Sequence, residues 1–162
     1  MKRIIYSGLI IVLVVVLCGS IIKRDIKDVS AQVYYIDNSM LRLIPIDVNL
    51  GKVTKGKAAK MITEKLMTDS GNKKILKLIP DEKGCIDVEV KDSTAIVNLK
   101  KTLAKNKPEN RTHGLLMVYS IVNSLTSIDG IDTVKFLVEG KEEKNYISGL
   151  DMREVFIPDY YM

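Results

Sequence analysis

The stretch from Leu115 to Lys141 constrains the fold most, because two hydrophobic periodicities meet there across a glycine-containing turn. Its first half repeats apolar residues at steps of three and four, which places them on one side of a helix. Its second half alternates apolar and charged residues, which is typical of a strand with one buried face. The helix positions are Leu115, Val118, Val122 and Leu125, and the inward strand positions are Val134, Phe136 and Val138. The sequence therefore predicts a helix packed against a strand.

Two further pairs of strands are predicted from the same kind of pattern. The run Gln32–Ile36 is rich in β-branched and aromatic residues, and Leu41–Leu50 follows it after turn-forming residues, so we expect a hairpin. Pro45 cannot donate a ladder hydrogen bond, which predicts an edge position or a bulge for the second strand. A clean alternation at residues 86–90 is repeated at residues 95–99, which predicts a second hairpin with one buried face.

Two amphipathic helices separate these strand pairs. A short helix carries apolar residues at helical spacing between Ala58 and Leu66, and a long helix runs from about Asn110 to Ser127. A short return strand is expected at Tyr146-Ile147, followed by a polar-aromatic tail, Phe156–Met162. This order of elements indicates an α+β fold: a single, mostly antiparallel sheet with both helices packed on one face.

The N-terminus carries a membrane-targeting element that is not part of the fold. Residues 4–22 are almost wholly apolar and are flanked by basic residues, and a bilayer-spanning helix needs about 20 such residues. We expect an uncleaved anchor in the cell membrane, with the rest of the chain outside the cytoplasm. Lipidation of Cys18 is one alternative, although Leu17 stands where a lipoprotein signal places a small residue, and cleavage with release is another. Residues 1–30 are therefore assigned to anchor and linker, and residues 31–162 to one domain.

The basic net charge does not point to nucleic acid. The chain carries a formal charge of +5, but five basic and two acidic residues among the first 30 account for three of these charges, which leaves residues 31–162 nearly neutral. Lysine-rich stretches at 52–60, 73–77 and 100–107 could form a basic rim facing anionic wall polymer or lipid headgroups. We interpret them instead as solvated loops and helix faces.

Cysteine and histidine offer little chemistry in this chain. One of the two cysteines, Cys18, lies in the targeting element, so no disulfide is expected within the domain. Cys85 is interpreted as a small buried apolar side chain, and nothing in the spacing pairs it with the single histidine, His113. Two cysteines and one histidine cannot supply the four ligands of a structural zinc ion. We expect no catalytic residue, no metal and no cofactor.

Paired carboxylates are the remaining candidates for acid–base chemistry on wall glycans. The two pairs are Asp87 with Glu89 and Glu142 with Glu143. Neighbouring acidic residues on the polar face of a strand or in a turn usually face solvent, and we interpret both pairs in that way. The chain is therefore expected not to be an enzyme.

Ordered segments along residues 32–157 resemble one known family. They are Val33–Asp37, Leu43–Val48, Ile79-Pro80, Val97-Asn98-Leu99, Ser120–Leu125, Gly130-Ile131, Val134–Gly140 and Gly149-Leu150. Their order and spacing together resemble the GerMN domain family of sporulation and spore germination proteins. Asn123, Gly130 and Gly140 are the marker residues within these segments. Asn123 is interpreted as a helix-face amide that bonds a neighbouring loop backbone, since buried amides usually satisfy nearby groups.

The resemblance implies a function in the cell envelope. It implies a non-catalytic module at the outer face of the membrane, connected with spore formation or germination. Expected partners are the membrane, through residues 4–22, and another envelope protein, with weak homo-oligomerisation and no nucleic acid. The alternatives are a protein that binds or modifies wall polymer, and a self-assembling scaffold that pairs exposed sheet edges near Pro45 or Tyr146.

Overall fold

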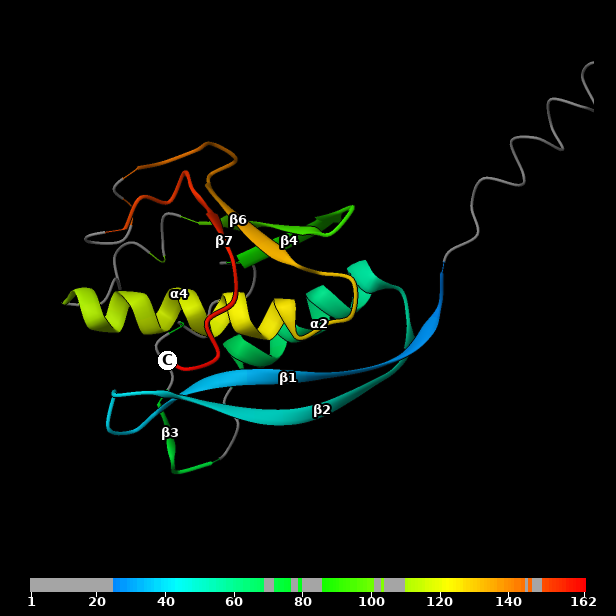
Figure 1. Ribbon diagram of the computed structural model, residues 1–162, viewed down its shortest axis with the longest axis horizontal. Helices are drawn as coiled ribbons and strands as arrows, with labels where there is room; N and C mark the ends of the chain where they lie inside the picture. The colour runs from blue at the N-terminus through cyan, green and yellow to red at the C-terminus, as the bar shows by residue number, and fades with distance from the viewer. Residues whose placement is uncertain are drawn as a thin grey trace, which may run out of the picture.

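The computed structural model describes residues 25–68, 72–76, 79, 86–100, 103, 110–144, 146 and 150–162 (Figure 1). The elements in chain order are β1 Lys27–Asp37, β2 Leu43–Val53, α2 Lys55–Met67, β3 Ile75–Leu76, β4 Ile86–Lys91, β5 Thr94–Leu99, α4 Arg111–Thr126, β6 Thr133–Val138 and β7 Val155–Phe156. Both predicted hairpins and both predicted helices are confirmed. None of the helices in this part of the chain has the length and hydropathy that a membrane span requires. The targeting element with Cys18, and also Cys85, lie outside the described residues.

The strands form two sheets, and the prediction of a single sheet was wrong. One sheet has the order β2-β1-β3, and the other has the order β4-β5-β6-β7. Every pairing is antiparallel except that of β5 with β6, which is parallel. Hydrophobic alternation tells which side of a strand is buried but not which strand it pairs with, so the sequence pattern did not separate the sheets.

The helices lie between the two sheets and not on one face of a single sheet (Figure 1). Helix α4 contacts β1 on one side and β6 on the other, while α2 contacts β4 and β1. Val118, Val122 and Leu125 are fully buried, as the helical spacing predicts. The neighbouring face of α4, with Leu116, Met117 and Ile121, is also buried. Because α4 is covered from both sides, its apolar surface is wider than one stripe.

The edge of β1 that faces α4 is closed by serine side chains in place of a strand. The Tyr34 N–H donates to Ser124 Oγ at 2.8 Å, and the Ser120 hydroxyl donates to the Tyr34 carbonyl at 2.6 Å. The Gln32 N–H donates to Ser127 Oγ at 2.9 Å. Spacings of three and four residues place these three serines on one side of the helix. The buried backbone of β1 is therefore satisfied where β3 does not reach.

The N-terminal hairpin is longer than predicted. β1 begins at Lys27, within the segment assigned to the linker, and pairs there with Val53 of β2. Pro45 lies in an edge strand, as predicted, directly opposite Tyr34. The Tyr34 backbone turns away from β2 toward α4, so the Pro45 nitrogen faces away from β1 as well. Its missing N–H therefore costs the ladder no hydrogen bond.

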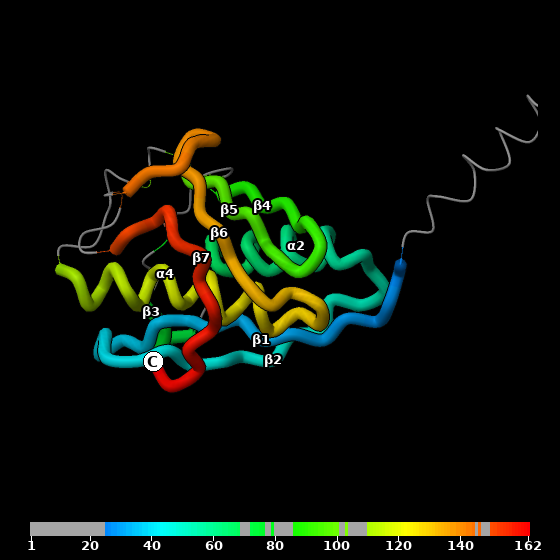
Figure 2. Tube along the Cα trace, turned by 45° about the horizontal axis from the view of Figure 1, so that its top comes forward, coloured from blue at the N-terminus to red at the C-terminus, as the bar shows by residue number. Residues whose placement is uncertain are grey.

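The last residues, which we call the C-terminal strap (residues 155–162), connect the two sheets. The strap starts as β7 beside β6 and passes over α4 toward the β1–β2 hairpin, as Figures 1 and 2 show. At its end the Met162 carbonyl accepts the Leu43 N–H at 3.0 Å. The sequence did not predict β7, because two residues are too short to alternate. At the expected return strand, Tyr146 is buried, and Ile147 is outside the described residues.

Candidate functional site

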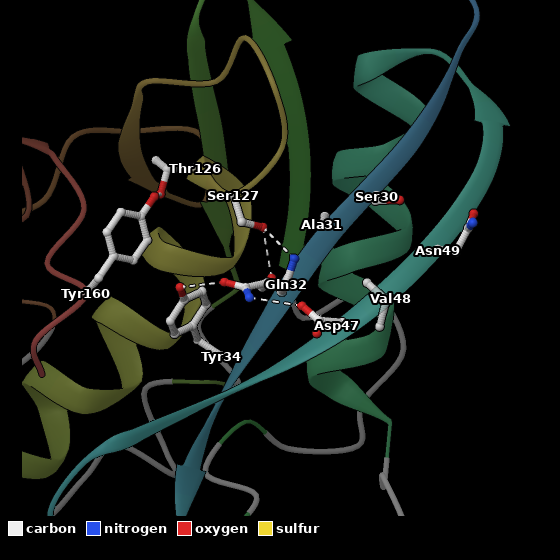
Figure 3. A pocket seen from close by; sticks show the side chains of 10 residues that line it. All are labelled: Ser30, Ala31, Gln32, Tyr34, Asp47, Val48, Asn49, Thr126, Ser127 and Tyr160. Carbon is white, nitrogen blue, oxygen red and sulfur yellow. Dashed lines mark hydrogen bonds between the residues drawn. The ribbon is translucent and has the colours of Figure 1, made fainter.

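An open groove of about 870 Å³ lies between the β1–β2 hairpin, the end of α4 and the C-terminal strap (Figure 3). We call it the β1–β2 groove. Its floor is built by the strand pairing, which sets Gln32 opposite Asp47 and Ser30 opposite Asn49. Alternate residues of a strand point to opposite faces, so Gln32 reaches the groove while Val33 enters the core. The groove is thus a direct product of the hairpin register.

The polar side chains of the floor are joined to one another. Gln32 Nε2 donates to Asp47 Oδ1 at 2.9 Å, and the Tyr34 hydroxyl donates to Gln32 Oε1 at 2.9 Å (Figure 3). Burial raises the pKa of Tyr34 above its usual 10.0, and the nearby Tyr160 hydroxyl and Asp47 carboxylate raise it further. The Tyr34 hydroxyl therefore stays protonated and remains a donor at neutral pH. This chain of hydrogen bonds fixes the position of Asp47.

Two tyrosines form one side of the groove. The rings of Tyr34 and Tyr160 have centroids 5.6 Å apart and are tilted by 34°. Tyr34 is 7% exposed, whereas Tyr160 is 49% exposed. The Tyr160 hydroxyl lies 3.3 Å from Thr126 Oγ1. Tyr34 is therefore a buried support, and Tyr160 presents ring surface to solvent.

Exposed apolar side chains are concentrated in the C-terminal strap. The large hydrophobic residues that are exposed in the described part of the chain are Ile26, Leu41, Val155, Ile157, Tyr160 and Tyr161. Four of these six belong to the strap, and Tyr161 is 101% exposed. Phe156 in the same segment is buried and packs edge-on against Phe136, with centroids 5.3 Å apart. Some side chains of the strap are thus packed in the core, while others are exposed to solvent.

Asn123, the first marker residue, fixes the strap. Its side chain is 1% exposed, its Nδ2 donates to the Asp159 carbonyl at 2.6 Å, and its Oδ1 accepts the Asp159 N–H at 3.0 Å. This is the contact with a neighbouring loop backbone that the interpretation of Asn123 predicts. The residue does not line the groove, but it sets the position of Tyr160, which does.

The two marker glycines have conformational roles away from the groove. Gly130 has φ +80° in the turn after α4, and its carbonyl accepts a hydrogen bond from Lys55 Nζ at 3.0 Å. Gly140 has φ +77° in the tight turn after β6, where its N–H donates to Asn98 Oδ1 at 2.8 Å. Residues with side chains rarely adopt these φ values, which accounts for glycine at both positions.

A second hollow, of about 630 Å³, lies near the start of β1 and the start of α2. Lys27 there forms an ion pair with Asp25 at 3.1 Å. Lys55 Nζ donates to the Asp92 carbonyl at 2.5 Å as well as to Gly130. The lysines of this hollow are therefore engaged within the chain, and Lys55 is a structural residue. Its neighbours Lys52, Lys57 and Lys60 are exposed.

The candidate acidic residues lie apart from both hollows. Asp87 and Glu89 are exposed on β4, and Glu142 and Glu143 are exposed after the tight turn, as the solvent-facing interpretation predicts. Glu142 forms an ion pair with Lys135 at 2.6 Å. No group of three or more metal-ligating side chains occurs among the described residues.

His113 sits in the first turn of α4, where its N–H donates to Asn110 Oδ1 at 2.9 Å. Asn110 is the helix N-cap, which satisfies a backbone donor that the first turn leaves free. Because Cys85 lies outside the described residues, its relation to His113 stays a prediction.

The sequence did not single out the groove residues Gln32, Asp47 and Tyr160. Strand alternation places Gln32 and Tyr34 on one face of β1, and this alternation can be read from the sequence. Asp47 joins them only through the hairpin register, and Tyr160 only through the path of the strap. Neither of these follows from local pattern.

Comparison with known proteins identifies relatives of this fold. The family profile described as Germane, sporulation and spore germination, matches residues 32–144. No curated protein matches the chain. Among solved structures, the first GerMN domain of the sporulation protein GerM from Bacillus subtilis has a TM-score of 0.59 at 21% identity, covering 75% of this chain and 92% of that one.

Two further structures share the fold. The tandem GerMN domains of the same protein have a TM-score of 0.63 at 20% identity, and the match covers 81% of this chain but 46% of that one. A Clostridium perfringens protein, described as a candidate lipoprotein, has a TM-score of 0.55 at 18% identity, covering 80% of this chain and 87% of that one. The described domain therefore corresponds in size to a single GerMN domain.

Proposed function

We propose, from the premise that this chain belongs to the Germane family of sporulation and spore germination proteins, that it is a non-catalytic interaction domain held on the outer side of the cell membrane. It binds another envelope protein, and the C-terminal strap is the contact surface. The anchor is the apolar segment of residues 4–22, either as a membrane span or through a lipid on Cys18. The description of the Clostridium perfringens neighbour as a candidate lipoprotein supports an envelope location.

The observation that carries the proposal is the concentration of exposed apolar side chains on a fixed strap. Interfaces between proteins are enriched in tyrosine and in apolar residues that pack centrally. Ile157, Tyr160 and Tyr161 offer such groups, and exposed apolar clusters of this kind mark interaction sites. The strap is already held by β7, Asn123 and Met162, so binding would order little further backbone.

The hydrogen bonds made by Asp47 and by the single histidine support the non-catalytic part of the proposal. The groove carboxylate of Asp47 is joined to Gln32 and lies on an exposed strand position, which suits recognition. The single histidine bonds its own helix cap. Both arrangements favour a binding domain over a hydrolase.

In-cell crosslinking tests this proposal. A photo-crosslinking amino acid replaces Tyr161 in the full-length chain, and crosslinked products are collected from sporulating cells. Glu89, exposed on the opposite sheet, is the matched control position. We expect one discrete envelope protein to be captured from position 161 and not from position 89. Capture of the same products from both positions, or of none from position 161, would contradict the proposed surface.

A further inference from the structure

The β1–β2 groove has a lining that disfavours anionic and strongly apolar ligands. Among the described residues, Asp47 is the single charged one in its lining, and the described lysine-rich stretches do not border it. A lone carboxylate repels phosphate polymers, so teichoic-acid-like or nucleic-acid ligands would bind poorly. Most of the other lining side chains are hydroxyls and amides, which would lose hydrogen bonds to water if an apolar ligand covered them. A neutral ligand rich in hydroxyl groups fits this lining.

Two side chains on the groove floor have hydrogen-bonding capacity left over. Asp47 Oδ1 is held by Gln32, which leaves Oδ2 with no partner among the described residues. Asn49 Oδ1 accepts the Gly51 N–H at 2.7 Å, which leaves its NH₂ group with no partner in the same part of the chain. Residues two apart on a strand share a face and lie about 7 Å apart. The floor thus presents a fixed acceptor beside a fixed donor pair, and sugar hydroxyl and acetamido groups require both.

The groove also contains an aromatic ring that is supported from behind. A pyranose ring has one face made largely of C–H groups, and such faces pack on the electron-rich face of an aromatic ring. Tyr160 is half exposed, and the buried Tyr34 ring backs it at 5.6 Å. Asn123 fixes the residue before it, so the ring needs little ordering before it binds.

We propose that the β1–β2 groove binds a neutral polysaccharide chain. Asp47 accepts a hydrogen bond from a hydroxyl or acetamido N–H of the sugar, and Asn49 donates to a sugar oxygen. The C–H face of the same or the next sugar packs on Tyr160. A groove of about 870 Å³ matches the volumes of typical ligand sites and holds more than one sugar unit. In the outer compartment proposed above, the abundant chain of this class is the amino-sugar strand of the wall.

Titration of the full-length chain tests the site directly. The isotope-labelled chain is purified in a zwitterionic detergent without sugar headgroups and is followed by NMR through the side-chain amides of Gln32 and Asn49. The probes are chitohexaose and cellohexaose, which are neutral, and wall glycan strands stripped of peptide, whose free lactyl carboxylates make them the anionic comparison. We expect saturable shifts of these amides with at least one probe. The three probes distinguish acetamido-dependent recognition from recognition of sugar hydroxyls alone.

Variants assign the binding to the groove. Asp47→Ala and Tyr160→Ala should each weaken binding about tenfold. The first removes a hydrogen bond to a charged acceptor, and the second removes the aromatic ring on which the sugar packs. Asp132→Ala is the matched control, since Asp132 is exposed but does not line the groove. Asp47→Ala changes an exposed strand position, so it keeps the test valid if Tyr160→Ala disturbs the strap.

Two results would overturn the inference. One is the lack of shifts with all three probes at low-millimolar concentration, and the other is binding that Asp47→Ala and Tyr160→Ala leave unchanged. Neither result depends on the protein partner proposed for the strap, because the titration contains no partner. Conversely, failed capture at position 161 would leave the sugar titration unaffected.

Discussion

Asn123 and Asp159 are joined by two hydrogen bonds, one from the Asn123 amide to the Asp159 carbonyl at 2.6 Å and one from the Asp159 N–H to Asn123 Oδ1 at 3.0 Å. A primary amide can satisfy both backbone groups of one residue in this way, which makes it a specific clamp for a chain without regular structure. Tyr160 and Tyr161 directly follow the clamped residue. One buried amide on α4 therefore positions both proposed binding surfaces.

Replacing this amide should loosen the strap. Asn123→Leu keeps the approximate volume but leaves the Asp159 N–H and carbonyl without their partner, and we expect a loss of about 1–3 kcal/mol in the free energy of unfolding. Denaturant unfolding measures the change. Asn38→Leu, the same substitution in an exposed turn, should change stability by less than about 0.5 kcal/mol. Equal effects at the two positions would show that the clamp does not contribute.

The serine contacts of α4 give a second stability prediction. Ser124→Ala removes the acceptor of the buried Tyr34 N–H, and an unsatisfied buried donor costs about 1–3 kcal/mol. Ser30→Ala serves as the control, because Ser30 occupies an exposed position of β1. Chemical denaturation of both variants compares the two losses. If Ser124→Ala were as stable as the parent chain, the serines would not be substituting for a strand at the edge of β1.

Two glycine-to-alanine substitutions should change the stability of the domain in opposite directions. Gly140→Ala places a side chain at φ +77°, which costs about 1–2 kcal/mol even though no atom lies within 4 Å of the new Cβ. Gly56 also has open space around its Cβ position, but it lies in the first turns of α2. Gly56→Ala should therefore stabilise the domain, by up to about 1 kcal/mol. Thermal melting distinguishes them, and a shift in the same direction for both would refute the backbone argument.

The sequence predicted local features well and the assembly of the sheets poorly. Periodicity located α4 within a residue at each end, because its caps Asn110 and Ser127 border the apolar pattern. Pro45 identified an edge strand, because its missing donor is incompatible with a central one. The second sheet and β7 depend on long-range strand pairing, which the local hydrophobic pattern does not specify. The groove was missed for the same reason, since Tyr160 and Asp47 meet only after the strap crosses α4.

Acid should weaken the fold through two carboxylates. The hydrogen bond from Arg153 lowers the pKa of Asp151 to about 2, and the hydrogen bond from Ser39 lowers that of Asp37 below its usual 3.8. Both groups bind protons less readily when folded, so their stabilising contribution is present above pH 3.8. It is lost as the pH falls through the folded values.

Melting temperatures measured between neutral pH and pH 2 test this expectation. Asp151→Asn should flatten the decline between about pH 4 and 2, because the amide no longer titrates. Glu64→Gln, on the exposed face of α2, is the control and should leave the slope unchanged. A decline in Asp151→Asn as steep as that of the parent chain would mean that other groups dominate the acid sensitivity.

The form of the anchor is decided by the mature N-terminus. Leu17 before Cys18 disfavours lipoprotein processing, while the apolar run of residues 4–22 has the length of a bilayer span. We therefore expect the membrane-bound protein to keep residue 1, to take up no labelled fatty acid, and to behave unchanged in Cys18→Ala. Mass spectrometry of the protein purified from membranes measures this. A diacylglyceryl adduct on an N-terminal Cys18 would establish the lipid anchor instead, and a soluble chain that begins near Ile21 would establish release.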